Sequence, residues 1–181
     1  MKVTFPHLGN TYIAVKILFD ALDIDYIIPD LNNKESLRVG SLISPDEICL
    51  PFKYMMGSYV HSIEKGADTI IIVGSCGPCR LGQYAELQEK IINKKYNNVK
   101  FIVIDLPGDI GFKEFFRRLS LIVENKKLSK KQIAKAAYNA YKAINIIDTI
   151  EEKVYELSAY EVNSNEMIKL LHKCKSEVVK E

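Results

Sequence analysis

An uninterrupted apolar run at residues 69–73 is the feature that most constrains how this chain can fold. All five residues, Thr-Ile-Ile-Ile-Val, are β-branched. Since successive side chains of a strand point to opposite faces, this sequence is typical of a strand that is buried on both faces. Stretches with apolar residues at helical spacing stand before and after the run. Since strands that alternate with helices form parallel sheets covered by helices, the run predicts a central strand of such a sheet.

The first half of the chain repeats this alternation of strand and helix. The strand patterns lie at residues 2–5, 25–28, 69–73 and 99–104, and the helical patterns at 12–22, 35–42, 52–65 and 81–95. We therefore expect residues 1–110 to form an α/β domain, Rossmann-like and three-layered, around a parallel sheet of four strands. In such a sheet the functional crevice lies beyond the carboxyl ends of the strands.

The second half of the chain changes character and is helical in pattern to its end. Ser129, with Gln132 three residues later, is a capping-box pattern that opens a helix over about residues 130–160. A terminal helix follows, so we expect residues 111–181 to be an all-helical C-terminal segment. The apolar stripe of the long helix favours either packing on the rest of the chain or a dimer or partner surface. The stripe consists of Ile133, Ala137, Ala140, Ile144, Ile147, Ile150, Val154 and Leu157.

Composition and charge exclude several classes of function. A formal net charge of +2 over 181 residues is too small to indicate a protein that binds nucleic acid or a membrane surface. No stretch approaches the roughly 20 apolar residues of a membrane span, and residues 1–2 lead directly into a strand pattern rather than a signal sequence. We therefore expect a cytoplasmic protein. The chain has no Gly-rich phosphate loop, so we do not expect it to hydrolyse ATP itself.

Three of the four cysteines occupy loop positions around the predicted central strand. Cys76 and Cys79 follow that strand in the sequence Gly-Ser-Cys-Gly-Pro-Cys, and Cys49 lies upstream beside Pro51. If the loop of Cys49 folds back over the sheet edge, the three thiols meet there. Three thiols at one edge indicate a soft-metal or redox site. Cys174 falls on the apolar side of the last helix, and we leave it out of the site.

Three chemistries fit these thiols. An iron–sulfur cluster can take two thiolates from one C-x-x-C turn and a third from a remote cysteine. A zinc site of three cysteines and one histidine could use His7 or His61. The tetrapeptide Cys-Gly-Pro-Cys is also the one that thioredoxins use for dithiol chemistry, although this chain has no tryptophan. The pattern of residues alone leaves all three chemistries open, together with a fourth alternative in which the thiols are unligated members of the core.

Polar and small residues near the same edge could support such a site. Arg80 and Gln83 follow the cysteine pair and could donate hydrogen bonds, while Gly77 allows a close approach of backbone N–H groups. His7 and Asn10 follow the first strand pattern and are expected along the same edge. No residue is assigned a catalytic role.

At these residues the chain resembles the iron–sulfur proteins related to 2-hydroxyacyl-CoA dehydratases. It looks most similar to the N-terminal lobe of the branch labelled CoA-substrate-specific enzyme activase or acyl-CoA dehydratase activase-related protein. The resemblance covers most of the chain. The stretches that carry it are KVTFPHLGN (2–10), PDLNNKESLRVG (29–40), ICLPFK (48–53), GADTIIIVGSCGPCRLGQYAELQ (66–88) and the helical region from Pro107 onward.

The resemblance implies a [4Fe–4S] cluster held by Cys49, Cys76 and Cys79, with one iron left for water, substrate or another ligand. It implies low-potential electrons from a separate ATP-hydrolysing activator and, in the dehydratases, an acyl-CoA substrate.

The resemblance therefore implies a component of a reductive dehydratase- or reductase-like system, a lyase or an oxidoreductase, in an anaerobic host. Members of the branch continue into a second α/β lobe, so we expect such a lobe, or another copy of this chain, as a partner. The competing interpretations are a zinc- or cluster-stabilised interaction module and a dithiol oxidoreductase.

Overall fold

The computed structural model describes residues 1–74, 80–123, 126, 128–162 and 165–180. The contacts between residues divide the chain into two compact units. The sheet unit comprises residues 1–7 and 24–127, and the helix unit comprises residues 8–23 and 128–181.

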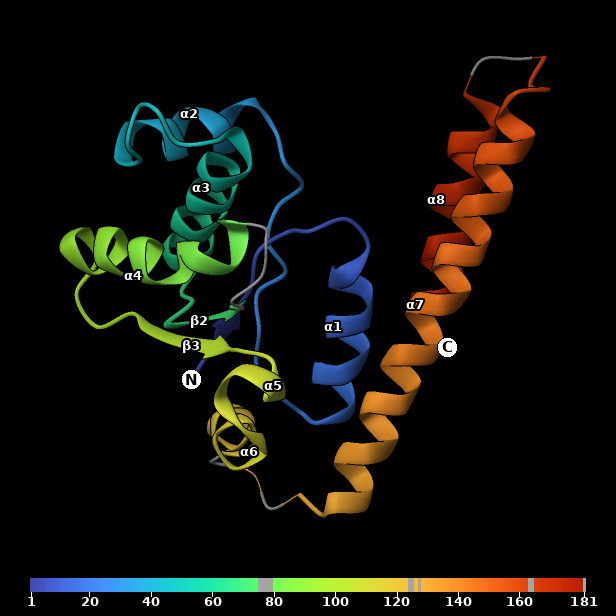
Figure 1. Ribbon diagram of the computed structural model, residues 1–181. Helices are drawn as coiled ribbons and strands as arrows, with labels where there is room; N and C mark the ends of the chain where they lie inside the picture. The colour runs from blue at the N-terminus through green and yellow to red at the C-terminus, as the bar shows by residue number, and fades with distance from the viewer. Residues whose placement is uncertain (75–79, 124–125, 127, 163–164, 181) are drawn as a thin grey trace. The chain divides into compact units, whose positions relative to one another are not determined.

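The sheet unit is built on a parallel sheet that has three strands in the described part of the chain (Figure 1). In spatial order the strands are β1 (Val3–Thr4), β2 (Thr69–Val73) and β3 (Lys100–Ile104). Thr69 of β2 pairs with Val3 on one side and with Lys100 on the other, so the strands are aligned at their starts. The first four residues of β2 are buried, which confirms the predicted central strand.

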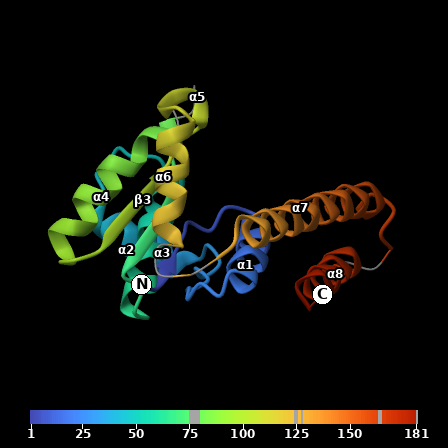
Figure 2. The same cartoon turned by 90° about the horizontal axis from the view of Figure 1, so that it is seen from below.

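Helices lie on both sides of this sheet (Figures 1 and 2). They are α2 (Lys34–Ile43), α3 (Leu50–Glu64), α4 (Tyr84–Lys95), α5 (Pro107–Ile110) and α6 (Phe112–Ile122), with a short 3-10 helix, η1 (Arg80–Gln83), ahead of α4. The core forms where α3 and α4 cover Ile70 and Ile72 of β2, and it centres on the buried Phe52 and Tyr59 of α3. α6 lies against β3 on the other side.

The expectation of a Rossmann-like sheet of four strands followed by a helical tail is wrong. The segment expected as the second strand, residues 25–28, meets β1 only through a single parallel bridge between Val3 and Tyr26. The ladder stops there because β1 has two residues and because Pro29, which ends the other segment, has no N–H to donate. The described residues are mostly helical, and both halves of the chain contribute helices to both units.

The helix unit contains three helices within the residues that the structure describes. They are α1 (Thr11–Ala21), α7 (Lys130–Ser158) and α8 (Glu166–Lys180). α7 packs against both others, and Lys175 of α8 reaches Glu151 of α7 with an Nζ–Oε1 distance of 2.6 Å. The predicted capping box is confirmed: the Ser129 hydroxyl accepts the N–H of Gln132, whose side chain accepts the N–H of Ser129.

The buried face of α7 differs in part from the predicted stripe. Ala137 and Leu157, both predicted on the stripe, are exposed. Alanines fill much of the contact instead, and small side chains let a neighbouring helix approach closely, which shifts the contact around the helix. The buried residues of α7 are Ala136, Ala140, Ala143, Ile147 and Val154.

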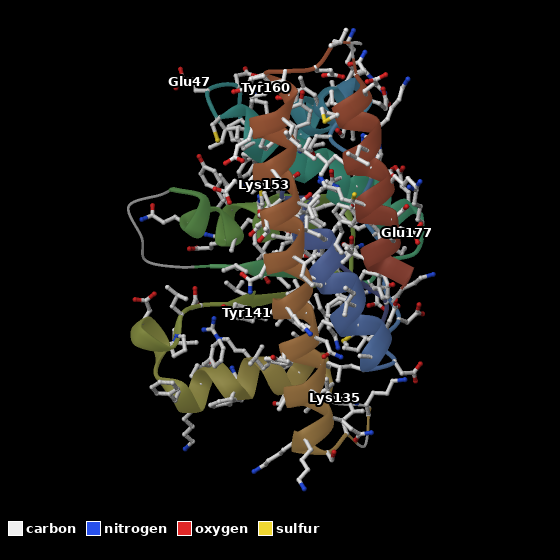
Figure 3. All side chains as sticks on the ribbon, turned by 90° about the vertical axis from the view of Figure 1, so that its right-hand side faces the viewer. Glu47, Lys135, Tyr141, Lys153, Tyr160 and Glu177 are labelled. Atoms are coloured by element: carbon white, nitrogen blue, oxygen red, sulfur yellow. The ribbon has the colours of Figure 1, made fainter. Side chains whose placement is uncertain are left out.

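The exposed side of α7 is polar and aromatic. Lys135, Tyr141 and Lys153 are exposed along it, and Figure 3 shows them spaced over the length of the helix. In the described ranges no helix combines the length and the apolar character needed to cross a membrane.

Two glycines allow α2 and α3 to cross in backbone contact. A Cβ atom added at Gly40 of α2 would overlap the carbonyl oxygen of Lys53 in α3, and one added at Gly57 of α3 would overlap that of Ser36 in α2. Since both obstacles are backbone atoms, no side-chain rotation can relieve the overlap. The two glycines therefore fix the crossing of the helices, and with it the loop of residues 44–49 that joins them.

Replacing Gly40 by alanine should destabilise the sheet unit by about 3 kcal/mol, because the added methyl group forces the two helices apart. Gly108→Ala is the matched control: its added Cβ would have no neighbour within 4 Å, and the change should alter stability by less than about 1 kcal/mol. Urea unfolding followed by far-UV circular dichroism measures both. Equal unfolding midpoints for the two variants would show that the crossing is not fixed in this way.

Candidate functional site

Cys49 lies where the loop from α2 enters α3. Its backbone is extended, with φ −64° and ψ 154°, and it occupies the N-cap position of the helix. Pro51 in the first turn favours a helix that starts here. The Cys49 side chain makes no capping hydrogen bond and is partly exposed. The thiol therefore does not cap the first turn of the helix.

The Cys49 thiol lies beside Tyr84, the first residue of α4. The distance from Cys49 Sγ to Tyr84 Oη is 3.2 Å, which is a hydrogen-bonding distance for sulfur. Tyr84 is 6% exposed, and its ring meets Phe52 edge-on with the centroids 4.9 Å apart. Phe52 belongs to the same first turn of α3 as Cys49. These three side chains therefore join the first turns of α3 and α4.

The cysteine pair lies outside the described residues. Residues 75–79 are not described, and they include the predicted site residues Cys76, Gly77 and Cys79. The residues that bracket this stretch are described. Before it, Gly74 extends β2, and its N–H donates to the carbonyl oxygen of Ile104 at 3.0 Å. After it, η1 leads directly into Tyr84.

The other predicted site residues have different surroundings. His7 is 8% exposed, and burial lowers the pKa of its imidazole below the ordinary value, so it is neutral at neutral pH. Gln83 is exposed and makes no capping hydrogen bond to α4, and Arg80 opens η1. Asn10 precedes α1 in the helix unit. Among the described side chains, Tyr84 is the hydrogen-bonding partner of Cys49.

His61 does not share a site with Cys49. It lies in the last turn of α3, and at a helical rise of about 1.5 Å per residue the two are about 18 Å apart. Its Nδ1 is 3.8 Å from the carboxylate of Asp30, which also pairs with Lys65 at 2.7 Å. A zinc ion held by Cys49 therefore cannot take His61 as a ligand.

A charged network lies at the carboxyl end of β3. Nη1 of Arg118 in α6 donates to the carboxylate of Asp105 at 2.5 Å and to the carbonyl oxygen of Val103 at 2.8 Å. Its Nε donates to Glu114 at 3.0 Å. A Cβ atom at Gly74 would come closer than 3.0 Å to the Asp105 carboxylate, so the missing side chain lets this carboxylate approach the end of β2.

Neither Tyr84 nor Arg118 is among the site residues predicted from the sequence. Tyr84 is the first aromatic residue after the cysteine pair, and this position could have marked it. Only the register of α3 against α4 brings it to Cys49, which lies 35 positions away in the chain. Arg118 has no comparable signal, because it is one of two adjacent arginines on an amphipathic helix.

The residues that the structure describes contain no group of three or more His, Cys, Asp or Glu side chains arranged to hold a metal ion. Comparisons with protein families, with curated proteins and with solved structures find no match for this chain. Its function is therefore inferred from its own residues.

Replacing Glu114 by glutamine should lower stability in a pH-dependent way. Hydrogen bonds from Arg117 and Arg118 lower the pKa of Glu114 from 4.5 to about 2. Because this pKa is depressed in the folded protein, the ion pairs stabilise it above pH 4.5, and the stabilisation is lost as the pH falls toward about 2. The urea midpoints of Glu114→Gln and the unchanged protein should therefore converge over that interval.

The matched control for this measurement is Glu86→Gln. Glu86 makes a single ion pair with Lys90, at 2.6 Å and one turn away on the exposed side of α4. Its replacement should shift the midpoint less than Glu114→Gln does. A difference for Glu114→Gln that stays constant through the acid interval would count against the ion pairs as its cause.

Proposed function

We propose that this chain binds a [4Fe–4S] cluster through Cys49, Cys76 and Cys79 and accepts low-potential electrons from an ATP-dependent activator. It would act as a component of a dehydratase-like reductive system. The observation that carries the proposal is the contact between Cys49 and Tyr84. This contact brings the remote cysteine to the start of α4, which follows the C-x-x-C segment after the short helix η1.

The order of residues along the chain supports the proposal that the three thiols meet. Cys76 follows Gly74 by two positions, and Gly74 directly follows β2. Cys79 precedes Tyr84, the described partner of Cys49, by five positions. The two cysteines of the pair are therefore close in sequence to the described residues that border the site.

The donor set suits an iron–sulfur cluster better than the alternatives. Thiolates are the usual ligands of such clusters, and three of them leave one iron free for a further ligand. A structural zinc site needs four protein ligands, and of the two histidines considered for it His61 is too distant from Cys49, which leaves His7 alone. Dithiol chemistry needs only the C-x-x-C pair and gives Cys49 no role. Bound at this site, the cluster would supply one-electron redox chemistry.

Protein purified without oxygen should contain about four irons and matching acid-labile sulfide per chain, and Cys49→Ser should lose most of both. The control is Cys174→Ser, which removes the other described thiol, a partly buried cysteine on α8 in the helix unit. This control should keep its iron. Iron and sulfide analysis with a visible absorption spectrum measures both variants.

Two results would contradict the proposal. Stoichiometric zinc without iron would favour a structural module whose surface binds a partner. No metal, together with two thiols that react quickly and are unaffected by Cys49→Ser, would favour a dithiol oxidoreductase.

A further inference from the structure

We propose that Tyr84 is a positioning residue that donates a hydrogen bond to the Cys49 sulfur and thereby raises the reduction potential of the bound cluster. The proposal rests on the function proposed above, since it concerns the sulfur ligand that Cys49 supplies. The observation behind it is the Sγ–Oη distance of 3.2 Å.

The direction of this hydrogen bond follows from the chemistry of the ligand. Between a thiol and a phenol, either group can donate. A cysteine that binds a metal is a thiolate and has no proton to give. Once Cys49 is a ligand, the hydroxyl of Tyr84 must therefore be the donor.

The position of the hydroxyl is set by packing and does not depend on the sulfur. Tyr84 is 6% exposed and belongs to the same core as Phe52, Met55 and Tyr59. Its ring packs edge-on against Phe52, with an angle of 90° between the planes. One turn further along both helices, Gln88 Nε2 lies 3.8 Å from Met55 Sδ, so the two helices keep their register beyond the first turn.

A donor at this position favours the reduced cluster over the oxidised one. Reduction adds one electron and makes the cluster and its thiolates more negative, and a hydrogen bond to the sulfur stabilises that added charge. The proposed role of Tyr84 is a hydrogen bond to the sulfur, and it involves no transfer of a proton.

The test compares Tyr84→Phe with Tyr59→Phe in the full chain. Both changes remove one buried tyrosine hydroxyl from the same core and keep the ring. Tyr59 is fully buried, and its hydroxyl has no hydrogen-bond partner among the described residues, so Tyr59→Phe removes no contact to sulfur. Iron content is measured first, and a redox titration followed by electron paramagnetic resonance then gives the reduction potential of each protein.

We expect all three proteins to bind iron equally and Tyr84→Phe alone to have a more negative potential. At a fixed solution potential its ratio of reduced to oxidised cluster should be about threefold to tenfold lower, where tenfold corresponds to about 59 mV for one electron. Fluorotyrosine at position 84 keeps the ring and the hydroxyl but makes the hydroxyl a stronger donor. It should shift the potential in the opposite direction, which a merely structural role would not do.

The outcomes separate this proposal from the one on which it rests. Iron-loaded Tyr84→Phe with the same potential as Tyr59→Phe would overturn the role of Tyr84 and leave the cluster in place. An unchanged protein without iron would overturn both proposals. If Tyr84→Phe folds but loses its iron, the fluorotyrosine protein provides the test. Its reduction potential must rise if the proposal is correct, and an unchanged potential would overturn it.

Discussion

The backbone contact between α2 and α3 is the constraint on which the rest of the sheet unit depends. It is possible only because Gly40 and Gly57 have no side chains where the helices cross. Asn33 and Ser36 begin α2 with reciprocal hydrogen bonds between side chain and backbone, and the carbonyl oxygen of the buried Ser36 faces Gly57. The crossing sets where the loop of residues 44–49 can run, and therefore where Cys49 enters α3.

Much of the order of helices and strands could be predicted from the periodicity of apolar residues. The run at residues 69–73 is apolar throughout because the strand is buried on both faces. The stripe of α7 repeats at helical spacing because one face of that helix is buried. The number of strands could not be predicted in this way. Residues 25–28 have a strand composition, but whether they extend a ladder depends on how many residues β1 offers as partners.

Only those residues of the candidate site could be predicted whose type and spacing in the sequence indicate a ligand. The three cysteines stand out because the chain has only four cysteines and three of them fall at predicted loop positions. Tyr84 did not stand out, since its importance depends on a contact between two helices whose register no local pattern encodes. The network of Arg118 with Asp105 and Glu114 depends in the same way on the packing of α6 against β3. Sequence patterns reveal ligands more readily than the residues that orient them.

The position of Cys49 at the start of α3 couples the stability of this helix to the state of the thiol. N-cap positions are usually filled by Ser, Thr, Asp or Asn, whose side chains satisfy the first N–H groups and stabilise a helix by about 1 kcal/mol. Cys49 makes no such hydrogen bond, so the first turn of a 15-residue helix lacks this support. A negatively charged cluster bound to the sulfur would lie at the positive end of the helix dipole and would supply the missing stabilisation. Occupancy of the site and folding of α3 would then be thermodynamically linked, so that each favours the other.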